Sequence, residues 1–313
     1  MRKEIKVKME IILGKTAGFC YGVNNAVTKA DEYVKNNKNK KVYCLGELVH
    51  NKDVGNKLRK EGLNFIETIN EIDKDNLYKE EISLIIRAHG EPKSTYETLN
   101  KNNIEILDLT CPNVLMIHDL IEKHVKNGYY VFFIAEKGHP EVIGTYSYCD
   151  GECTIIENEC NIDIAFTEMF EKKRNKILVV AQTTFRIEKF EKYIEKIRNK
   201  VNLLNNKQEK IILEIRNTIC NATRLRQEET EELSKSVEYM IIIGGKNSSN
   251  TKKLYDISAK NCKNAILIQN YLELKNEYKK ELEKIKKLNK IGIMAGASTP
   301  KESIDEVIEI LKK

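Results

Sequence analysis

Three cysteines of this chain share one sequence setting. Cys20, Cys111 and Cys220 each follow a short apolar run and precede a helix-like stretch. They recur about 100 residues apart, which predicts a threefold internal repeat that brings three thiols to one centre. Each thiol is favoured as a thiolate, because the backbone N–H groups and the positive dipole end of a helix stabilise negative charge.

Three thiolates are one ligand short of a closed zinc site or a fully cysteine-ligated cubane iron–sulfur cluster. Soft sulfur ligands select zinc or iron–sulfur centres over magnesium or calcium. Two interpretations stay open here: a zinc-bound water that acts as a nucleophile, or a cluster with one iron free to bind substrate. The remaining cysteines lack the shared setting and are predicted to be free thiols, although two of them form a C-x3-C pair. They are Cys44, Cys149, Cys153, Cys160 and Cys262.

Polar side chains follow other apolar runs of the chain. Ligand sites in open parallel sheets lie at the carboxyl ends of the strands, so these side chains are expected to face one pocket. Histidinium, hydroxyl and amide donors suit a phosphate or diphosphate group. The residues predicted to bind substrate are His50, His89, His139, Thr183, Ser248, Ser249, Asn250 and Ser298.

Glu141, in the stretch GHPEV, is the carboxyl group that we expect to donate a proton. In a desolvated pocket beside an anionic centre the acid form of a carboxyl group is favoured, as general acid catalysis near neutral pH requires. Taken alone, the same stretch would favour a surface glutamate on a strand-to-helix loop.

Strand-like and helix-like segments alternate along the chain, which predicts parallel sheets with crossover helices. Amphipathic helices are expected at residues 51–62, 112–128 and 186–201, and Gly62 and Gly128 are expected to end the first two. The expected strands are residues 10–14, 40–46, 82–88, 103–109, 129–135, 176–182, 211–216, 239–245, 264–269 and 290–296.

Length and composition limit the possible classes of protein. The chain has 313 residues, of which 41% are hydrophobic, enough for several small packed units. No apolar stretch approaches the roughly 18 residues of a membrane span, and the N-terminal segment MRKEIKVKME lacks the apolar core of a signal peptide. We therefore expect a cytoplasmic protein without a membrane partner. Its net charge of +6 is spread over interleaved acidic and basic residues, so no nucleic-acid partner is expected.

Nine motifs, in chain order, closely resemble those of the 4-hydroxy-3-methylbut-2-enyl diphosphate reductase family. They are GFCYGV, LVHNKDV, RAHG, LTCPNV, GHPEVIGT, QTT, NTICNATRLRQ, NSSNT and AGASTP, and they extend from about residue 10 to residue 310. The resemblance implies three similar small α/β lobes in a pseudo-threefold trefoil around a central iron–sulfur cluster. This oxygen-sensitive [4Fe-4S] cluster would be held by Cys20, Cys111 and Cys220, with one open iron site. The expected lobes are residues 21–111, 112–219 and 220–313, the last completed by residues 1–20.

The resemblance also implies the reaction. It is reductive removal of the allylic hydroxyl of the diphosphate substrate to give isopentenyl and dimethylallyl diphosphates, the last step of the methylerythritol phosphate pathway. The hydroxyl end would reach the open iron beside His139, Glu141 and Thr183, and Glu141 would relay the proton. A flavodoxin or ferredoxin type donor would supply electrons one at a time. The diphosphate would be held by His50, His89, Ser248, Ser249, Asn250 and Ser298.

Two other functions are compatible with the same residues. One is a zinc hydrolase with a three-cysteine site, His139 or water as the fourth ligand and Glu141 as the base. The other is a non-enzymatic iron–sulfur sensor whose open iron binds a regulator. Two details depart from the family pattern: Ala135 stands where a glycine-rich turn often precedes GHPE, and RAHGEP differs from the frequent HGV form. Both concern loop shape and remove no proposed ligand.

Overall fold

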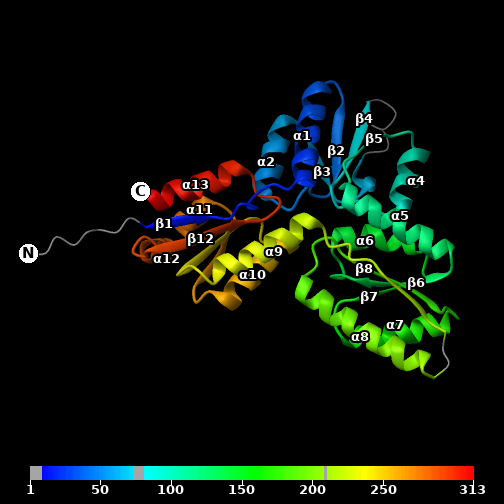
Figure 1. The fold of residues 1–313 in the computed structure, drawn as a ribbon. Coiled ribbons are helices and arrows are strands. Elements are labelled where there is room, and N and C mark those ends of the chain that lie inside the picture. Colours follow the sequence, from blue (N-terminus) through cyan, green and yellow to red (C-terminus); the bar gives the residue numbers. More distant parts are fainter. Residues whose placement is uncertain (1–8, 73–80, 208–209) are drawn as a thin grey trace, which may run out of the picture. The chain divides into compact units, whose positions relative to one another are not determined.

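The computed structural model describes residues 9–72, 81–207 and 210–313, and their strands form three four-stranded parallel sheets (Figure 1). The first sheet has the order β1 (Glu10–Leu13), β12 (Lys290–Ala295), β10 (Tyr239–Ile243), β11 (Ala265–Ile268). The second has the order β3 (Asn64–Ile66), β2 (Lys41–Leu45), β4 (Ile82–Ile86), β5 (Glu105–Asp108). The third has the order β7 (Cys153–Ile156), β6 (Tyr129–Ile134), β8 (Lys176–Ala181), β9 (Ile212–Ile215).

The three sheets share one spatial arrangement of strands, although the edge strand of the first sheet, β1, comes first in the chain. The edge strands β1, β5 and β9 each lead to one of the three cysteines that the sequence singles out, and each pairs in parallel with a neighbour, β12, β4 or β8. The repeat expected from the cysteine spacing is therefore present in the strand order.

Helices connect the strands, as the alternating sequence pattern predicts. None of the helices in the part of the chain that the structure describes is long and apolar enough to cross a membrane. The α-helices are α1 (Tyr21–Asn36), α2 (Lys52–Glu61), α4 (Lys93–Lys101), α5 (Pro112–Lys126), α6 (Pro140–Tyr146), α7 (Cys160–Glu171), α8 (Ile187–Asn205), α9 (Asn221–Ser234), α10 (Ser249–Asn261), α11 (Tyr271–Asn276), α12 (Lys279–Ile285) and α13 (Lys301–Lys312). Short 3-10 turns lie at Ile69–Glu71 and Ser147–Cys149.

All ten strands expected from the sequence are present, and the two short edge strands β3 and β7 were not expected. Gly62 and Gly128 follow α2 and α5 with φ angles of +112° and +80°. Glycine adopts this left-handed conformation at little cost, which is why it ends helices. The expectation that these two glycines stop their helices is confirmed.

The chain divides into two compact units. Of the described residues, the first unit contains 9–23, 50–54 and 221–313, and the second contains 24–49, 55–72, 81–207 and 210–220. The first sheet belongs to the first unit, and the other two sheets belong to the second. Residues 1–8 of the segment expected to complete the third lobe lie outside the described residues. The lobe boundaries given above stay a prediction.

In the first unit, the sheet is buried on both faces. Successive side chains of a strand point to opposite faces, so the residues of β10 divide between two cores. Ile241 and Ile243 pack with α11, α12 and α13, whereas Met240 and Ile242 pack with α9 and α10. Helices on both faces explain why the strand is apolar throughout, as buried parallel strands are.

The third sheet, in the second unit, follows the same rule. Phe132 and Ile134 of β6 pack with α7 and α8, while Val131 and Phe133 pack with α5 and α6. The second sheet has its own core, in which Leu84 and Ile86 pack against α4. These buried strands fix the loops at their carboxyl ends, where the candidate site residues lie.

Candidate functional site

The three cysteines have the same backbone anchor. The N–H of each donates to the carbonyl of the second residue after the neighbouring strand, β12, β4 or β8. The shared bond fixes each cysteine at the carboxyl end of its own sheet, immediately before α1, α5 or α9. The three bonds join Cys20 to Ala297 (3.3 Å), Cys111 to Ala88 (3.0 Å) and Cys220 to Thr183 (3.0 Å).

The sulfur atoms of these cysteines suit metal ligation. All three side chains are half-buried. The N–H of Val23, in the first turn of α1, donates to Cys20 Sγ at 3.5 Å, and Asn113 Nδ2 donates to Cys111 Sγ at 3.9 Å. N–H donors at a helix start favour a thiolate. Each of these sulfurs is a soft donor of the kind that iron–sulfur clusters use.

The other cysteines differ in their surroundings. Cys44, Cys149, Cys153 and Cys262 are buried, and Cys160 is exposed. Burial raises the pKa of Cys44 to about 12 and raises the pKa of Cys153 well above its usual value. A thiol that keeps its proton is a poor metal ligand.

Glu141 is buried and paired with Thr183. Its side chain, in the first turn of α6, is 2% exposed, which excludes the surface-glutamate alternative. Oε1 accepts the backbone N–H of Thr183 at 2.6 Å, and Oε2 accepts the Thr183 hydroxyl, also at 2.6 Å. A hydroxyl group can both donate and accept a hydrogen bond. When Glu141 is protonated, Oε2 can therefore donate to the Thr183 hydroxyl, and the hydrogen bond between them is kept. The pair can therefore hold or release a proton without rearranging.

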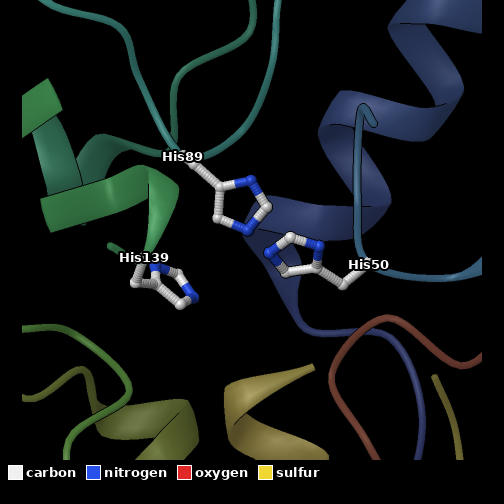
Figure 2. A group of neighbouring side chains, drawn as sticks. All are labelled: His50, His89 and His139. Carbon is white, nitrogen blue, oxygen red and sulfur yellow. The ribbon is translucent and has the colours of Figure 1, made fainter. Parts of the chain in front are cut away.

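His139 caps the helix that carries Glu141. Its Nδ1 accepts the N–H of Glu141 at 3.2 Å, so the proton of the neutral ring lies on Nε2. The rings of His139 and His89 stand edge to face with centroids 5.5 Å apart (Figure 2). The loop after β4 and the start of α6 thus present two imidazoles side by side.

Helix α6 packs closely on the loop of His89. A Cβ atom at Gly144 would lie 3.3 Å from backbone atoms of Gly90 and Glu91, so only glycine allows this approach without a shift. Glu91 is buried against Arg87, with Nε and Oε1 2.7 Å apart. Burial raises the pKa of Glu91, and Arg87 opposes that rise. This ion pair therefore stabilises the loop that carries His89.

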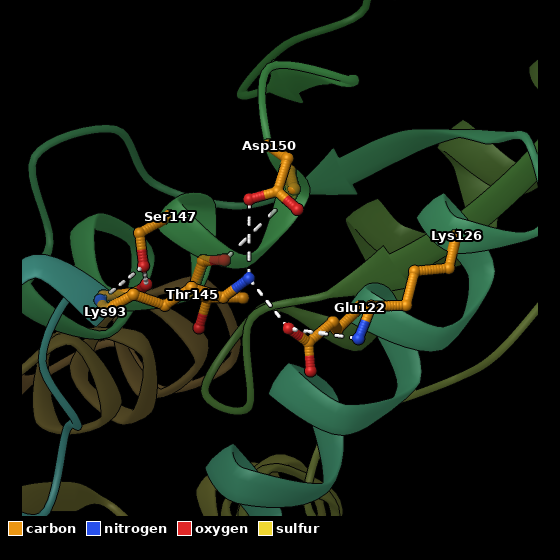
Figure 3. Close-up of polar contacts among 8 residues, drawn as sticks. Lys93, Glu122, Lys126, Thr145, Ser147 and Asp150 are labelled. Carbon is orange, nitrogen blue, oxygen red and sulfur yellow. Dashed lines mark hydrogen bonds and ion pairs between the residues drawn. The ribbon is translucent and has the colours of Figure 1, made fainter.

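The far end of α6 is held by a polar cluster (Figure 3). The Ser147 hydroxyl accepts the N–H of Lys93 at 3.1 Å and donates to the Gly144 carbonyl at 2.7 Å. The Lys93 ammonium lies 2.9 Å from Glu122 and 3.4 Å from Asp150. These bonds tie α6 to α4 and α5.

A buried histidine completes the support of α6. His118 Nε2 lies 3.0 Å from Thr145 Oγ1, and its ring stacks on Tyr148 at 4.0 Å. Burial lowers the pKa of His118 to about 4, so the ring is neutral at neutral pH. Glu141 is thus carried on a helix whose position is fixed along its whole length.

In the first unit, the start of α10 forms a candidate anion site. Ser248 caps the helix by accepting the N–H of Thr251 at 3.3 Å. Asn250 is 4% exposed, yet neither its oxygen nor its nitrogen has a hydrogen-bond partner among the described residues. A buried amide left unsatisfied costs about 1–3 kcal/mol, so it indicates a place where a polar ligand binds.

His50 and Ser298 are linked beside that helix start. Ser298 Oγ donates to the His50 carbonyl at 3.1 Å. A Cβ atom at Gly245, in the turn before α10, would lie 2.3 Å from the same carbonyl oxygen. The loop of His50 therefore rests directly on the glycine turn.

Lys253 was missed by the sequence reasoning. It is 5% exposed, and its ammonium donates to Ser249 Oγ at 2.5 Å. One helical turn separates the two residues, so the spacing in NSSNTKK was the signal that could have revealed the lysine. Its charge suits an anion bound at the start of α10.

The structure thus assembles two sets of site residues, one within each unit. The first unit contributes Cys20, His50, Ser248, Ser249, Asn250 and Ser298. The second contributes His89, Cys111, His139, Glu141, Thr183 and Cys220.

A model of the family described as LytB protein matches residues 11–312. The chain belongs to the LytB family. Similar curated members of the family are called 4-hydroxy-3-methylbut-2-enyl diphosphate reductase. That of Caldanaerobacter subterraneus subsp. tengcongensis is 40% identical over 305 residues, 97% of each chain. That of Aquifex aeolicus is 38% identical over 302 residues, 96% of this chain and 94% of the relative.

Solved structures agree with membership of the LytB family. A structure described as (E)-4-hydroxy-3-methyl-but-2-enyl diphosphate reductase, the terminal enzyme of the non-mevalonate pathway, is 36% identical with a TM-score of 0.66, covering 97% of this chain and 99% of that one. The E-1-hydroxy-2-methyl-but-2-enyl-4-diphosphate reductase from Plasmodium falciparum is 29% identical with a TM-score of 0.82, covering 98% and 89%. The family resemblance and the α/β fold class expected from the sequence are confirmed.

Proposed function

We propose that this chain is an iron–sulfur oxidoreductase that converts 4-hydroxy-3-methylbut-2-enyl diphosphate to isopentenyl and dimethylallyl diphosphates, the last step of the methylerythritol phosphate pathway. The observation that carries the proposal is the equivalent anchoring of Cys20, Cys111 and Cys220, each half-buried and at the start of a helix. Relatives with the reductase name, matched over nearly their full length, support it.

The three cysteines would hold a [4Fe-4S] cluster with one iron left without a protein ligand. Thiolates are the usual ligands of such clusters. When bound, the cluster supplies electrons one at a time and a Lewis-acid position for the substrate hydroxyl.

The diphosphate group would be bound by donors at the start of α10 and in the adjoining loops. Asn250 supports this assignment, because its buried amide has both a donor and an acceptor to offer. Lys253 adds positive charge through Ser249. The proposed diphosphate ligands are His50, His89, Ser248, Ser249, Asn250 and Ser298.

Glu141 would act as the proton donor. Loss of an allylic hydroxyl as water, with a new C–H bond, consumes two electrons and two protons. The carboxyl group of Glu141 gives a proton to the departing hydroxyl, and Thr183 holds the carboxyl group in place from both oxygens. His139 fixes the start of α6 and offers its Nε2–H to the same end of the substrate.

The electrons would come from a flavodoxin or ferredoxin type protein in the cytoplasm. Such carriers are typically acidic, and the net charge of +6 on this chain favours their approach.

Anaerobic purification tests the cofactor. The protein should be brown, contain about four irons per chain and lose its broad visible absorbance on reduction with dithionite. A colourless protein with stoichiometric zinc would instead support the zinc hydrolase and refute the proposal. A brown protein that leaves the hydroxylated diphosphate unchanged after reduction would support the sensor.

Glu141→Gln tests the proton donor. The variant keeps the side-chain shape and should retain the cluster and substrate binding, but turnover should fall by about 10²–10⁴-fold because the acid is lost. Glu97→Gln, an exposed change on α4, is the control and should leave turnover unaltered. Full activity of Glu141→Gln would remove Glu141 from the mechanism.

A further inference from the structure

The loop between β1 and Cys20 is bound to the side of α9. The Glu229 carboxylate accepts three hydrogen bonds from this loop: from the N–H of Lys15 at 2.6 Å, the N–H of Thr16 at 2.8 Å and the Thr16 hydroxyl at 2.5 Å. All of these residues belong to the first unit. One carboxylate therefore satisfies two consecutive backbone donors and fixes the direction in which the chain leaves β1.

Arg226, one turn earlier on the same helix, holds the other end of the loop. It is 4% exposed, and its Nη2 donates to the Gly18 carbonyl at 2.5 Å, while Nη1 donates to the Ala222 carbonyl at 2.9 Å. Gly18 has a φ angle of +96°, a conformation that non-glycine residues rarely adopt. A buried guanidinium thus stabilises an unusual turn that lies two peptide bonds before the Cys20 residue.

The opposite side of the loop is bound to β12 and the residues after it. Gly18 N–H donates to the Ala295 carbonyl at 3.5 Å, and Cys20 N–H donates to Ala297. A Cβ atom at Gly14 would lie 2.0 Å from Met294 Sδ, so the chain at Gly14 packs directly against this strand. Cys20 is therefore held from two directions, by backbone bonds to one strand end and by charged side chains of one helix.

The charge state of Glu229 supports its role as an acceptor. Burial alone would raise the pKa of this carboxyl group, but the hydrogen bonds from Thr16 and Lys15 outweigh burial and lower the pKa below its usual value. The group is ionised at neutral pH and accepts all three bonds. Hydrogen bonds to a charged acceptor are roughly twice as strong as neutral ones.

We propose that Arg226 and Glu229 are positioning residues for Cys20, and that they determine how firmly a cluster bound through this cysteine is retained. The effect on cluster retention rests on the proposed function. The effect on the position of Cys20 does not depend on that function. Both side chains act by fixing the backbone that presents one ligand.

Helix α9 supplies a matched control for each variant. Glu228 and Arg224 are exposed neighbours of the same types, and they pair with each other at 2.8 Å on the helix surface. Surface pairs of this kind contribute little stability. We therefore compare Glu229→Gln with Glu228→Gln, and Arg226→Met with Arg224→Met.

The first readout is iron release. After anaerobic reconstitution, the rate at which a ferrous chelator removes iron should rise by about tenfold or more in Glu229→Gln and Arg226→Met, as loss of a charged hydrogen bond implies. The control variants should release iron at the rate of the unchanged protein. Equal rates in all variants would overturn the proposal.

The second readout needs no cluster. In the anaerobic apoprotein, the rate of N-ethylmaleimide labelling, followed by peptide mass spectrometry, should rise at Cys20 and stay unchanged at Cys111 and Cys220. General destabilisation would instead speed labelling of all three cysteines, and that result would refute a positioning role. If Arg226→Met does not fold, Arg226→Lys keeps the charge but loses the forked geometry, and the same selective increase is expected.

The two readouts separate the two hypotheses. If the protein binds no iron, the proposed function fails, while selective labelling of Cys20 would still support the positioning role. If iron is bound but labelling and release are unaffected, the positioning role fails and the proposed function stands.

Discussion

Gly245→Ala tests whether the contact between the glycine turn and the His50 loop is required for diphosphate binding. The added Cβ atom would lie 2.3 Å from the His50 carbonyl oxygen, whereas ordinary contacts of this kind begin at 3.4 Å. The His50 loop must therefore move by about 1 Å, and a displacement of that size in a binding group costs about 10²-fold in rate. The φ angle of Gly245 is not in the left-handed region, so alanine introduces a steric clash without backbone strain.

Two consequences of this substitution should be measurable. The movement lengthens the 3.1 Å bond from Ser298 to His50, so KM for the diphosphate substrate should rise by at least tenfold, while kcat falls less. The clash should also lower the free energy of unfolding by about 1–3 kcal/mol, seen as a lower Tm. Steady-state kinetics with dithionite-reduced protein and thermal unfolding followed by circular dichroism measure the two effects.

Gly55→Ala is the control for this prediction. Gly55 lies inside α2, and the nearest atom to an added Cβ would be Arg59 Nη1 at 3.7 Å. Alanine is the better helix former by about 1 kcal/mol, so Tm should rise slightly and the kinetics should not change. If Gly245→Ala keeps both the KM and the Tm of the unchanged protein, the proposed dependence of the His50 position on this turn is wrong.

Two further predictions concern buried charged or titratable groups. Lys253→Met should weaken pyrophosphate binding by about tenfold in isothermal titration calorimetry, since a buried ammonium bonded to Ser249 is lost, whereas the exposed neighbour change Lys252→Met should have no effect. Equal affinities would exclude a role for the lysine. Burial lowers the pKa of His118 to about 4 from an ordinary value of 6.5, so its contribution to stability is present above pH 6.5 and lost as the pH falls toward 4. His118→Phe should flatten the dependence of Tm on pH in that range, and an unchanged slope would show that another group causes it.

The strands could be predicted from the sequence because the central strands are predominantly apolar runs. Residues 129–134, for example, are all buried or nearly so in β6. The two missed strands have only three or four residues, Asn64–Ile66 and Cys153–Ile156, and both lie at sheet edges. A run that short has no periodicity to detect. Their strand conformation depends on pairing with β2 and β6, which no local pattern encodes.

The candidate site was predictable in its residue types but not in its contacts. Glu141 is buried because Thr183, 42 residues further along the chain, binds both carboxylate oxygens. Arg226 and Glu229 lie in RLRQEETEEL, which looks like an ordinary solvated helix surface. Their partners in the loop are more than 200 residues away in sequence, so only the folded chain reveals that Arg226 is buried and Glu229 half-buried, while Arg224 and Glu228 are exposed.

The pairing of β1 with β12 has a consequence for the order in which the protein is made. Glu10 of β1 pairs with Lys290 of β12, so β1 can join its sheet only after β12 has been synthesised. At about 5–20 residues per second, that interval is on the order of 10–60 s of translation. The strands of the two other sheets are all synthesised before β12, so these sheets can form during translation. Cys20 obtains its backbone anchor at Ala297 only after residue 297 has been synthesised. A group bound through this cysteine therefore meets an anchored backbone only after β12 and the two residues that follow it have been made.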